Sequence, residues 1–452
     1  MAKEKNSGTP EVALTDSGTQ PGFWARLTED SWANLIGGSL VAGVLLWVFA
    51  LQGGKPVAPV YGWANAEALF GKVLHLDNLG IVALSGLVFA LLSSIAIKLS
   101  GGNLLKYLAG FSVIFILAIF SLIAAGNSGA SAYGIEYVIF ALLTGLLLNN
   151  LFKLPEWLKT AARSEFFIKT GLIILGTSVL FTDIIRAGFP GILQAVAVVS
   201  VVWFFSMWLS RRLKVDDEFG VILASAVSIC GVSAAIVASG AIQGDKKKLS
   251  YVTTLVLLIA IPMMILQPWI IQAFGIPEIV GGAWLGGTLD TTASVTAAAE
   301  QVGPAATKAG VIVKFSQNVL LGVAAFFIAT WWVLKKSPEA AAGSEKPGLK
   351  LIWERFPKFV LGFILVSLVF SFLIPAETVK LASGFLNSLR TLWFALAFVA
   401  IGLEARFSDL LKTQGGRPAL VFIGAQLFNI VWTLLWSYLL FGGVLLAVPD
   451  IK

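Results

Sequence analysis

The sequence has few of the residues that crosslink chains, bind metal ions or face water. Cys230 is the only cysteine and His75 the only histidine among 452 residues. No internal disulfide can form, and no zinc site built from histidine and cysteine is expected. Charged residues make up 13% of the chain, against about 25% in an ordinary soluble domain. A water-soluble globular enzyme is therefore excluded, because so few charges could not cover its surface.

The sequence has instead long, continuous apolar runs, and 57% of its residues are hydrophobic. Only α-helices and closed barrels satisfy their backbone hydrogen bonds in lipid, and barrel strands would read as short alternating segments. The sequence therefore predicts an all-α polytopic membrane protein that lies in the lipid bilayer. We attribute the net charge of +7 to the bias of lysine and arginine toward cytoplasmic loops, and no nucleic-acid partner is expected.

A helix needs about 20 apolar residues to cross the hydrocarbon core, and the sequence contains about eleven such spans. They are roughly 33–51, 78–98, 106–126, 134–152, 165–182, 188–209, 249–273, 305–333, 356–374, 385–404 and 418–441. The expected organisation is a cytoplasmic polar tail at 1–32, extra N-terminal transmembrane helices at 33–130, a first repeat with both broken segments at 131–333, a cytoplasmic linker at 334–355 and the C-terminal helices of the second repeat at 356–452.

Two further apolar segments, 219–242 and 281–300, are crowded with glycine, alanine, serine and threonine. Basic residues at 211–214 and 246–248 flank the first segment, so both of its ends are expected in the cytoplasm. Since the basic linker 334–355 is also expected there, the second segment must enter and leave from the opposite side. The sequence thus predicts two opposed re-entrant segments. The alternative is a pair of ordinary small-residue helices that pack tightly.

An internal repeat is visible around two similar stretches, 176–186 and 402–412. Both contain glycine, then phenylalanine, threonine or serine, aspartate, two aliphatic residues and a basic residue. In the predicted topology the two stretches lie on opposite sides of the membrane. Inverted repeats with broken helices near the midplane are typical of transporters.

Each broken segment has an irregular small-residue stretch followed by an alanine-rich run, which predicts a helix N-terminus inside the membrane. The free N–H groups and the positive dipole end of such a terminus attract anions. The candidate substrate-binding residues of the two segments are Ser228, Cys230, Gly231, Ser233, Thr291, Thr292 and Ser294. In the alternative interpretation, serine and threonine only cap buried helix ends and bind no ligand.

Two charged residues are expected deep in the membrane. Lys314 would cost about 2.5–3.5 kcal/mol at the bilayer centre, which marks it as a candidate functional residue. Gln317 and Asn318 follow on the same helical face, so the three side chains could line an anion site. Asp290 could bind a coupling Na⁺, carry a proton or form a structural ion pair with Lys314. Charges nearer the span ends are expected to snorkel or to face water; these are Lys169, Glu300, Lys308, Glu404 and Arg406.

No catalytic or nucleotide-binding pattern was found. The sequence has no GxxxxGK[ST] loop, no HExxH motif and no intramembrane pair of aspartates or of serine and histidine. An enzyme is therefore not expected, nor is a cofactor beyond a coupling Na⁺ or H⁺.

The run Ser228-Ile-Cys-Gly-Val-Ser-Ala-Ala resembles the SxICGxSA signature of the YeiH-like membrane proteins, a family of proposed sulfate exporters. Similar stretches occur at 145–149, 169–176, 313–314 and 398–403, and the resemblance covers about residues 134–440. It implies an inner-membrane secondary transporter of sulfate or a related sulfur oxyanion. The chain departs from the family pattern at Asp290-Thr291, where a His-Glu pair is common, and at Gln317, where an arginine is common.

Together these features predict an ion-coupled secondary active transporter of a small anion that works by alternating access. The N-terminus is expected in the cytoplasm, the location is a bacterial-type inner membrane, and analogy with other paired-hairpin transporters suggests a homodimer. Two alternatives stay open at this point. One is a cation/proton antiporter that uses Asp290 and Lys314, and the other is a membrane scaffold or sensor that transports nothing.

Overall fold

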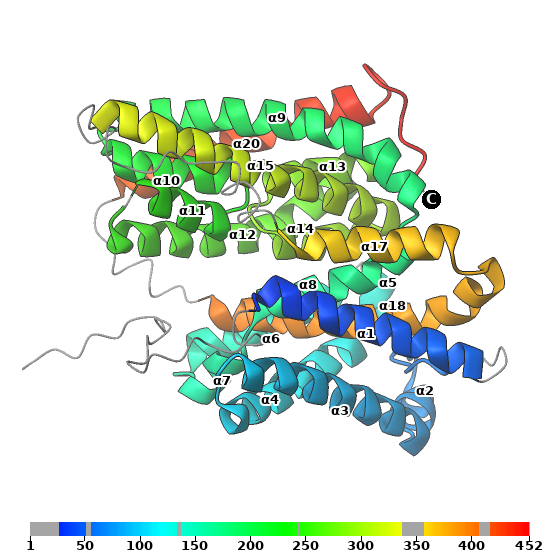
Figure 1. Ribbon diagram of the computed structural model, residues 1–452. Coiled ribbons are helices and arrows are strands. Elements are labelled where there is room, and N and C mark those ends of the chain that lie inside the picture. The colour runs from blue at the N-terminus through cyan, green and yellow to red at the C-terminus, as the bar shows by residue number, and fades with distance from the viewer. Residues whose placement is uncertain are drawn as a thin grey trace, which may run out of the picture.

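The computed structural model describes residues 27–50, 56–132, 137–242, 244–336, 357–405 and 416–451. Over these ranges the chain is helical apart from turns, irregular connecting segments and one isolated bridge between Trp63 and Asn127, so the prediction of an all-α protein is confirmed (Figure 1). Of the predicted organisation, residues 1–26, 337–355 and 406–412 lie outside the described ranges. The inverted repeat therefore stays a prediction, because most of its second stretch is among them.

Eight of the described helices are long and apolar enough to cross a membrane. They are α1 (Glu29–Ala50), α3 (Leu76–Leu99), α4 (Leu104–Ala125), α9 (Phe181–Arg212), α12 (Lys246–Ala273), α15 (Pro304–Lys336), α18 (Ala376–Glu404) and α20 (Arg417–Phe441). Shorter helices complete the described part: α2 (Ala66–Ala68), η2 (Leu69–Val73), α5 (Ser128–Ala132), α6 (Tyr137–Leu151), α7 (Glu156–Ala161), α8 (Ser164–Leu175), η3 (Gly176–Ser178), α10 (Asp217–Ser228), α11 (Val232–Ile242), α13 (Glu278–Thr288), α14 (Thr292–Glu300) and α17 (Phe359–Phe372).

The predicted span 165–182 is shorter in the structure than in the sequence pattern. Helix α8 ends at Leu175 and passes through the 3₁₀ turn η3 before α9 begins at Phe181. The hydroxyls of Thr177 and Ser178 donate to the carbonyls of Ile174 and Leu175 at 2.8 and 2.9 Å. Such local bonds compete with the helical ladder, which accounts for the early end of the helix.

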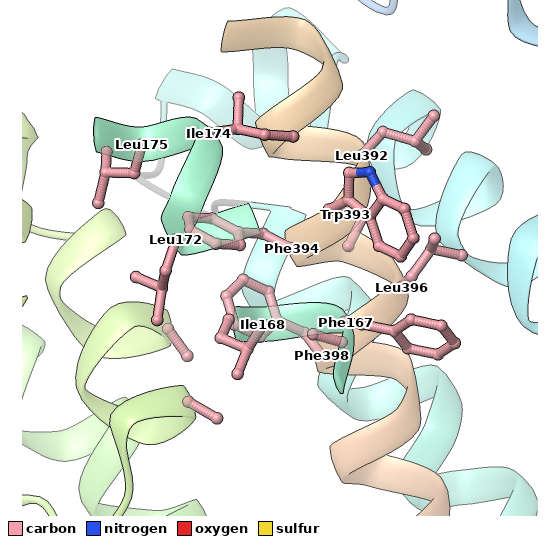
Figure 2. Close-up of a cluster of buried hydrophobic side chains, with 14 of the residues drawn as sticks. Phe167, Ile168, Leu172, Ile174, Leu175, Leu392, Trp393, Phe394, Leu396 and Phe398 are labelled. Carbon is pink, nitrogen blue, oxygen red and sulfur yellow. The ribbon is translucent and has the colours of Figure 1, made fainter. Parts of the chain in front are cut away.

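The helices form two layers in Figure 1. One layer contains α9 to α15 and α20, and the other contains α1, α3, α4, α6, α7, α8 and α18, with α17 beside the junction. Within the second layer, side chains of α8 pack against α18, and Trp393 stacks on Phe89 with ring centroids 4.4 Å apart. Figure 2 shows this core, with labels on Phe167, Ile168, Leu172, Ile174, Leu175, Leu392, Trp393, Phe394, Leu396 and Phe398.

The first broken segment folds as a hairpin of two short helices, α10 and α11. Near the start of α10, Asp216 and Glu218 accept hydrogen bonds from Nζ of Lys248 at 2.7 and 2.9 Å. Glu218 also accepts the backbone N–H of Asp245, which follows the end of α11. Both ends of the segment therefore lie together at the N-terminal end of α12.

The second broken segment, α13 and α14, is a hairpin whose ends also lie together. Glu278, at the start of α13, accepts the N–H groups of Ala305 and Ala306 at 2.7 and 3.2 Å, just after the end of α14. Gln272, in the last turn of α12, donates to the carbonyl of Gln301 at 2.9 Å. The ends of the first hairpin lie at the N-terminal end of α12, and those of the second lie at its C-terminal end. Since α12 has 28 residues and a helix rises about 1.5 Å per residue, the two hairpins start from opposite ends of this helix and point toward each other.

Candidate functional site

The tips of the two hairpins touch. Gly231 turns the chain between α10 and α11 with a φ of +59°, a conformation that only glycine adopts without strain. A Cβ atom on Gly231 would lie 3.0 Å from the Cβ of Asp290 and 3.2 Å from its carbonyl oxygen. The contact leaves no room for a side chain, so the glycine is required by both the turn and the approach of the second tip.

Lys314 joins the two tips from α15 and is 1% exposed. Its Nζ donates to the carbonyl of Ile229 at 2.7 Å and to Oε1 of Gln317 at 2.8 Å. The Nε2 of Gln317 in turn donates to the carbonyl of Gly287 in α13, at 3.1 Å. Lys314 and Gln317 therefore form a bridge of hydrogen bonds between the hairpins.

Asp290 lies at the second tip and is 2% exposed. Within the described part of the chain, neither of its carboxylate oxygens has a hydrogen-bond partner. The hydrogen-bonded ion pair with Lys314, one of the alternatives for these residues, is therefore not formed, because Nζ is directed to Ile229 and Gln317 instead. A buried carboxylate without a partner is costly, which makes it a place where a proton or a cation could bind.

The hydroxyl and amide groups beside the tips are partly used by the fold. Thr291 caps α14 by accepting the N–H of Ser294 at 3.0 Å, and the two hydroxyls lie 2.8 Å apart. Asn318 donates through Nδ2 to Oγ1 of Thr292 at 3.1 Å. The Oδ1 of Asn318 is buried and has no partner among the described residues. The Oδ1 of Asn318 is thus left for a ligand.

A cavity of about 310 Å³ lies against both tips. It is bounded on one side by the hairpins and α15, and on the other by α8 and the first residues of α1 and α17. The lining residues are Thr28, Asp30, Glu165, Lys169, Cys230, Ser233, Val237, Thr291, Thr292, Asn318, Leu321, Pro357, Lys358 and Phe359. The cavity lies toward the ends of α1, α8 and α17 that the sequence places in the cytoplasm.

The wall opposite the tips carries a cluster of charged side chains around Lys169. Lys169 was expected to snorkel, but its side chain is only 15% exposed and its Nζ lies 3.0 Å from Asp30, 3.3 Å from Glu29 and 3.6 Å from Glu165. It also lies 5.7 Å from the ring centre of Phe359. The i,i+4 spacing of Glu165 and Lys169 inside an apolar span was the sequence signal that could have indicated this cluster.

A second cavity of about 710 Å³ shares Glu165 with the first and lies at the same end of the helices. Glu404 in its wall accepts the N–H and the hydroxyl of Ser164 at 3.0 and 2.6 Å. We call this space the vestibule; its lining residues are Glu29, Glu156, Lys159, Thr160, Ala162, Arg163, Ser164, Glu165 and Glu404.

The structure brings most of the candidate site residues together. Cys230, Ser233, Thr291, Thr292 and Asn318 line the cavity beside the tips. Behind them lie Gly231, Asp290, Lys314 and Gln317. Ser228 and Ser294 do not line it either: the hydroxyl of Ser228 donates to the carbonyl of Ala224 within its own helix at 2.7 Å, and that of Ser294 is paired with Thr291.

Comparisons with known proteins place the chain among bacterial membrane proteins. The family model described as "Conserved hypothetical protein 698" matches residues 109–422. A UPF0324 membrane protein of Rhodopirellula baltica is 39% identical over 364 residues, which are 78% of this chain and 67% of that protein. One of Nitratidesulfovibrio vulgaris is 36% identical over 79% of this chain and 62% of its own length. One of Nitrosomonas europaea is 31% identical over 89% and 93%.

The chain thus spans about two thirds of the length of the first two relatives. No solved structure matches it.

Proposed function

The chain belongs to the family of UPF0324 membrane proteins, and we propose that it is a secondary active transporter of a small anion that works by alternating access. The observation that carries the proposal is the meeting of two opposed hairpin tips beside a cavity, with Lys314 bonded to one tip and, through Gln317, to the second hairpin. Hairpins of this kind would be the re-entrant segments of the predicted topology. Transporters place broken helices at such a site because the unwound backbone can contact the substrate.

The anion would bind where α11 and α14 begin. The first N–H groups of a helix have no intrahelical partner, and both N-termini follow directly after the tips. Ser233 and Thr292 would add hydroxyl donors from the cavity wall, and the Asn318 amide would orient the ligand. Lys314 would contribute its positive charge from behind the tip of the first hairpin, and Gln317 would hold that lysine in place. Sulfate or a related sulfur oxyanion is favoured by the resemblance to YeiH-like proteins.

Coupling would occur at Asp290. Its two oxygens are buried without a partner in the described chain, so Na⁺ or H⁺ would neutralise the carboxylate in the closed tip arrangement. Binding of either cation would lower the cost of holding the two tips together. Substrate and cation would then bind at adjacent positions, and the transport of one would be coupled to the gradient of the other.

The arrangement corresponds to an inward-facing state. The cavity and the vestibule lie at the end assigned to the cytoplasm. On the other side of the tips, Glu300, the last residue of α14 and thus at the base of the second hairpin, lies 3.7 Å from Arg390 in the middle of α18. This ion pair joins the two layers where an outward-facing state would have to open. We propose that one layer moves against the other, in a bacterial-type inner membrane with the N-terminus in the cytoplasm and in a homodimer.

The test is the thermal stability of the detergent-purified protein with sulfate, sulfite, thiosulfate, small carboxylates, Na⁺ and different pH values. A ligand at 100 times its dissociation constant stabilises the folded state by about 2.7 kcal/mol. We expect an anion-dependent shift that Lys314→Ala and Asn318→Ala abolish. Lys380→Ala, which removes an exposed lysine of α18, should keep the shift. A full shift in both site variants would contradict the assignment.

A cation/proton antiporter is the second candidate, and the unpartnered Asp290 favours it. In that case Asp290 would exchange Na⁺ for H⁺, and Lys314 would compete with the cation. Stabilisation by Na⁺ and pH with no response to any anion would select this function over the first.

A further inference from the structure

The two walls of the cavity differ in charge. The tip wall presents the N-termini of α11 and α14, where the helix dipoles favour a negative group. The opposite wall holds the carboxylates of Glu29, Asp30 and Glu165 around a single ammonium, that of Lys169. Lys358 also lines the cavity, so this wall presents two carboxylates, Asp30 and Glu165, and two lysines.

Lys169 is not free to receive an anion. Its Nζ lies within 3.0 to 3.6 Å of three carboxylates, and an ammonium group has three N–H donors. Asp30 and Glu165, which line the cavity beside it, have acceptor capacity left over, since each ionised carboxylate can accept about four hydrogen bonds. The wall opposite the tips therefore offers acceptors that a bare dianion cannot use, because a dianion has no hydrogen to donate.

A second, independent observation also indicates a ligand with hydrogen to donate. Asn318 lines the cavity and is 5% exposed, and its Oδ1 has no partner among the described residues. A buried acceptor without a donor is costly, and sulfate carries no hydrogen at neutral pH. A protonated amine can donate to this oxygen and to the carboxylates of the opposite wall.

The size of the cavity agrees with a ligand longer than a tetrahedral oxyanion. Its volume of about 310 Å³ corresponds to the liquid volume of about ten water molecules, whereas sulfate has only five heavy atoms. A ligand that reaches both walls needs two polar ends joined by a short spacer.

We infer that the substrate is a small zwitterion, with a sulfonate or carboxylate at the N-termini of α11 and α14 and a protonated amine at Asp30 and Glu165. The inference rests on the proposed function, because it names the substrate class of the same cavity. The substrate would thus not be a bare oxyanion such as sulfate, but an oxyanion group joined to an amine by a short spacer.

The experiment compares three probes on the purified full chain: 3-aminopropane-1-sulfonate, propane-1-sulfonate and propylamine. Dissociation constants come from ligand-dependent melting, with each variant measured against its own ligand-free baseline. We expect the zwitterion to bind at least ten times more tightly than either single-charge probe. The double variant Asp30→Asn/Glu165→Gln should reduce that preference over propane-1-sulfonate to less than threefold.

The matched control is Asp77→Asn/Glu377→Gln, which makes the same two chemical changes at exposed positions away from the cavity and should keep the full preference. If propane-1-sulfonate binds the unmodified chain as tightly as the zwitterion, the inference is wrong and the anion transporter stands. The inference also fails if the double variant keeps the tenfold preference. Binding of propylamine alone, or of no probe, overturns both the inference and the proposed function.

Discussion

Replacement of Gly231 by alanine tests the contact between the two hairpin tips. At a φ of +59° an L-residue other than glycine costs about 1–2 kcal/mol. The new Cβ would also lie 2.8 Å from Cγ1 of Val256 and 3.0 Å from Cβ of Asp290, inside the normal carbon separation of about 3.5–4.0 Å. Overpacking of this kind costs about 1–3 kcal/mol. We therefore expect Gly231→Ala to lower the free energy of unfolding by about 2–5 kcal/mol and to separate the tips.

The control lies on the same hairpin. Gly240 is an exposed residue of α11, and no atom lies within 4 Å of the position of its Cβ, so Gly240→Ala should stabilise the helix by about 0.5–1 kcal/mol. The assay is thermal melting in detergent, with and without the anion that shifts the parent protein. If Gly231→Ala melts like Gly240→Ala and keeps the anion response, the tips do not meet as described.

Three further predictions concern access, gating and pH. Cys230 is the only thiol and lines the cavity. A membrane-impermeant methanethiosulfonate should therefore label it from the cytoplasmic side, and bound substrate should slow the labelling. Equal labelling from both sides, without protection by substrate, would refute an inward-facing cavity. Arg390→Gln breaks the pair with Glu300 and should raise labelling of Cys230 from the outer side, whereas an unchanged ratio would remove that pair from the gate. Partial burial alone would raise the pKa of Asp216, but hydrogen bonds from Lys248 and the Phe219 amide hold the pKa below its ordinary value. The stabilisation from this carboxylate should therefore be present above its ordinary pKa of about 4 and be lost as the pH falls through the lowered value. Asp216→Asn, which can still cap α10, should melt below the parent at neutral pH and match it in acid; a constant difference would contradict this.

The helices and their breaks could be predicted because they are local properties of the sequence. Apolar runs of sufficient length mark the spans, and the small-residue stretches around Gly231 and Asp290 mark the two interruptions. Lys314 stood out for the same reason, since one charge inside a long apolar helix is visible without any tertiary information.

The opposite wall of the cavity could not be predicted in the same way. Glu29 and Lys169 lie 140 residues apart in the chain, and only the packing of α1 against α8 brings them together. The partners of the hydroxyl groups could not be predicted either: that of Ser228 donates to Ala224 in its own helix, and that of Ser294 is paired with Thr291, the residue that caps α14. The unpaired state of Asp290 depends on where Nζ of Lys314 is directed, which sequence spacing does not determine.

The most direct test of the central claim is counterflow in proteoliposomes loaded with unlabelled anion. We predict that radiolabelled sulfate or radiolabelled 3-aminopropane-1-sulfonate accumulates transiently and saturably. Accumulation should be absent with folded Lys314→Ala protein and retained with Lys380→Ala. If neither compound accumulates while an imposed pH gradient drives Na⁺ flux, the chain is a cation antiporter and the account of an anion site between the hairpin tips is wrong.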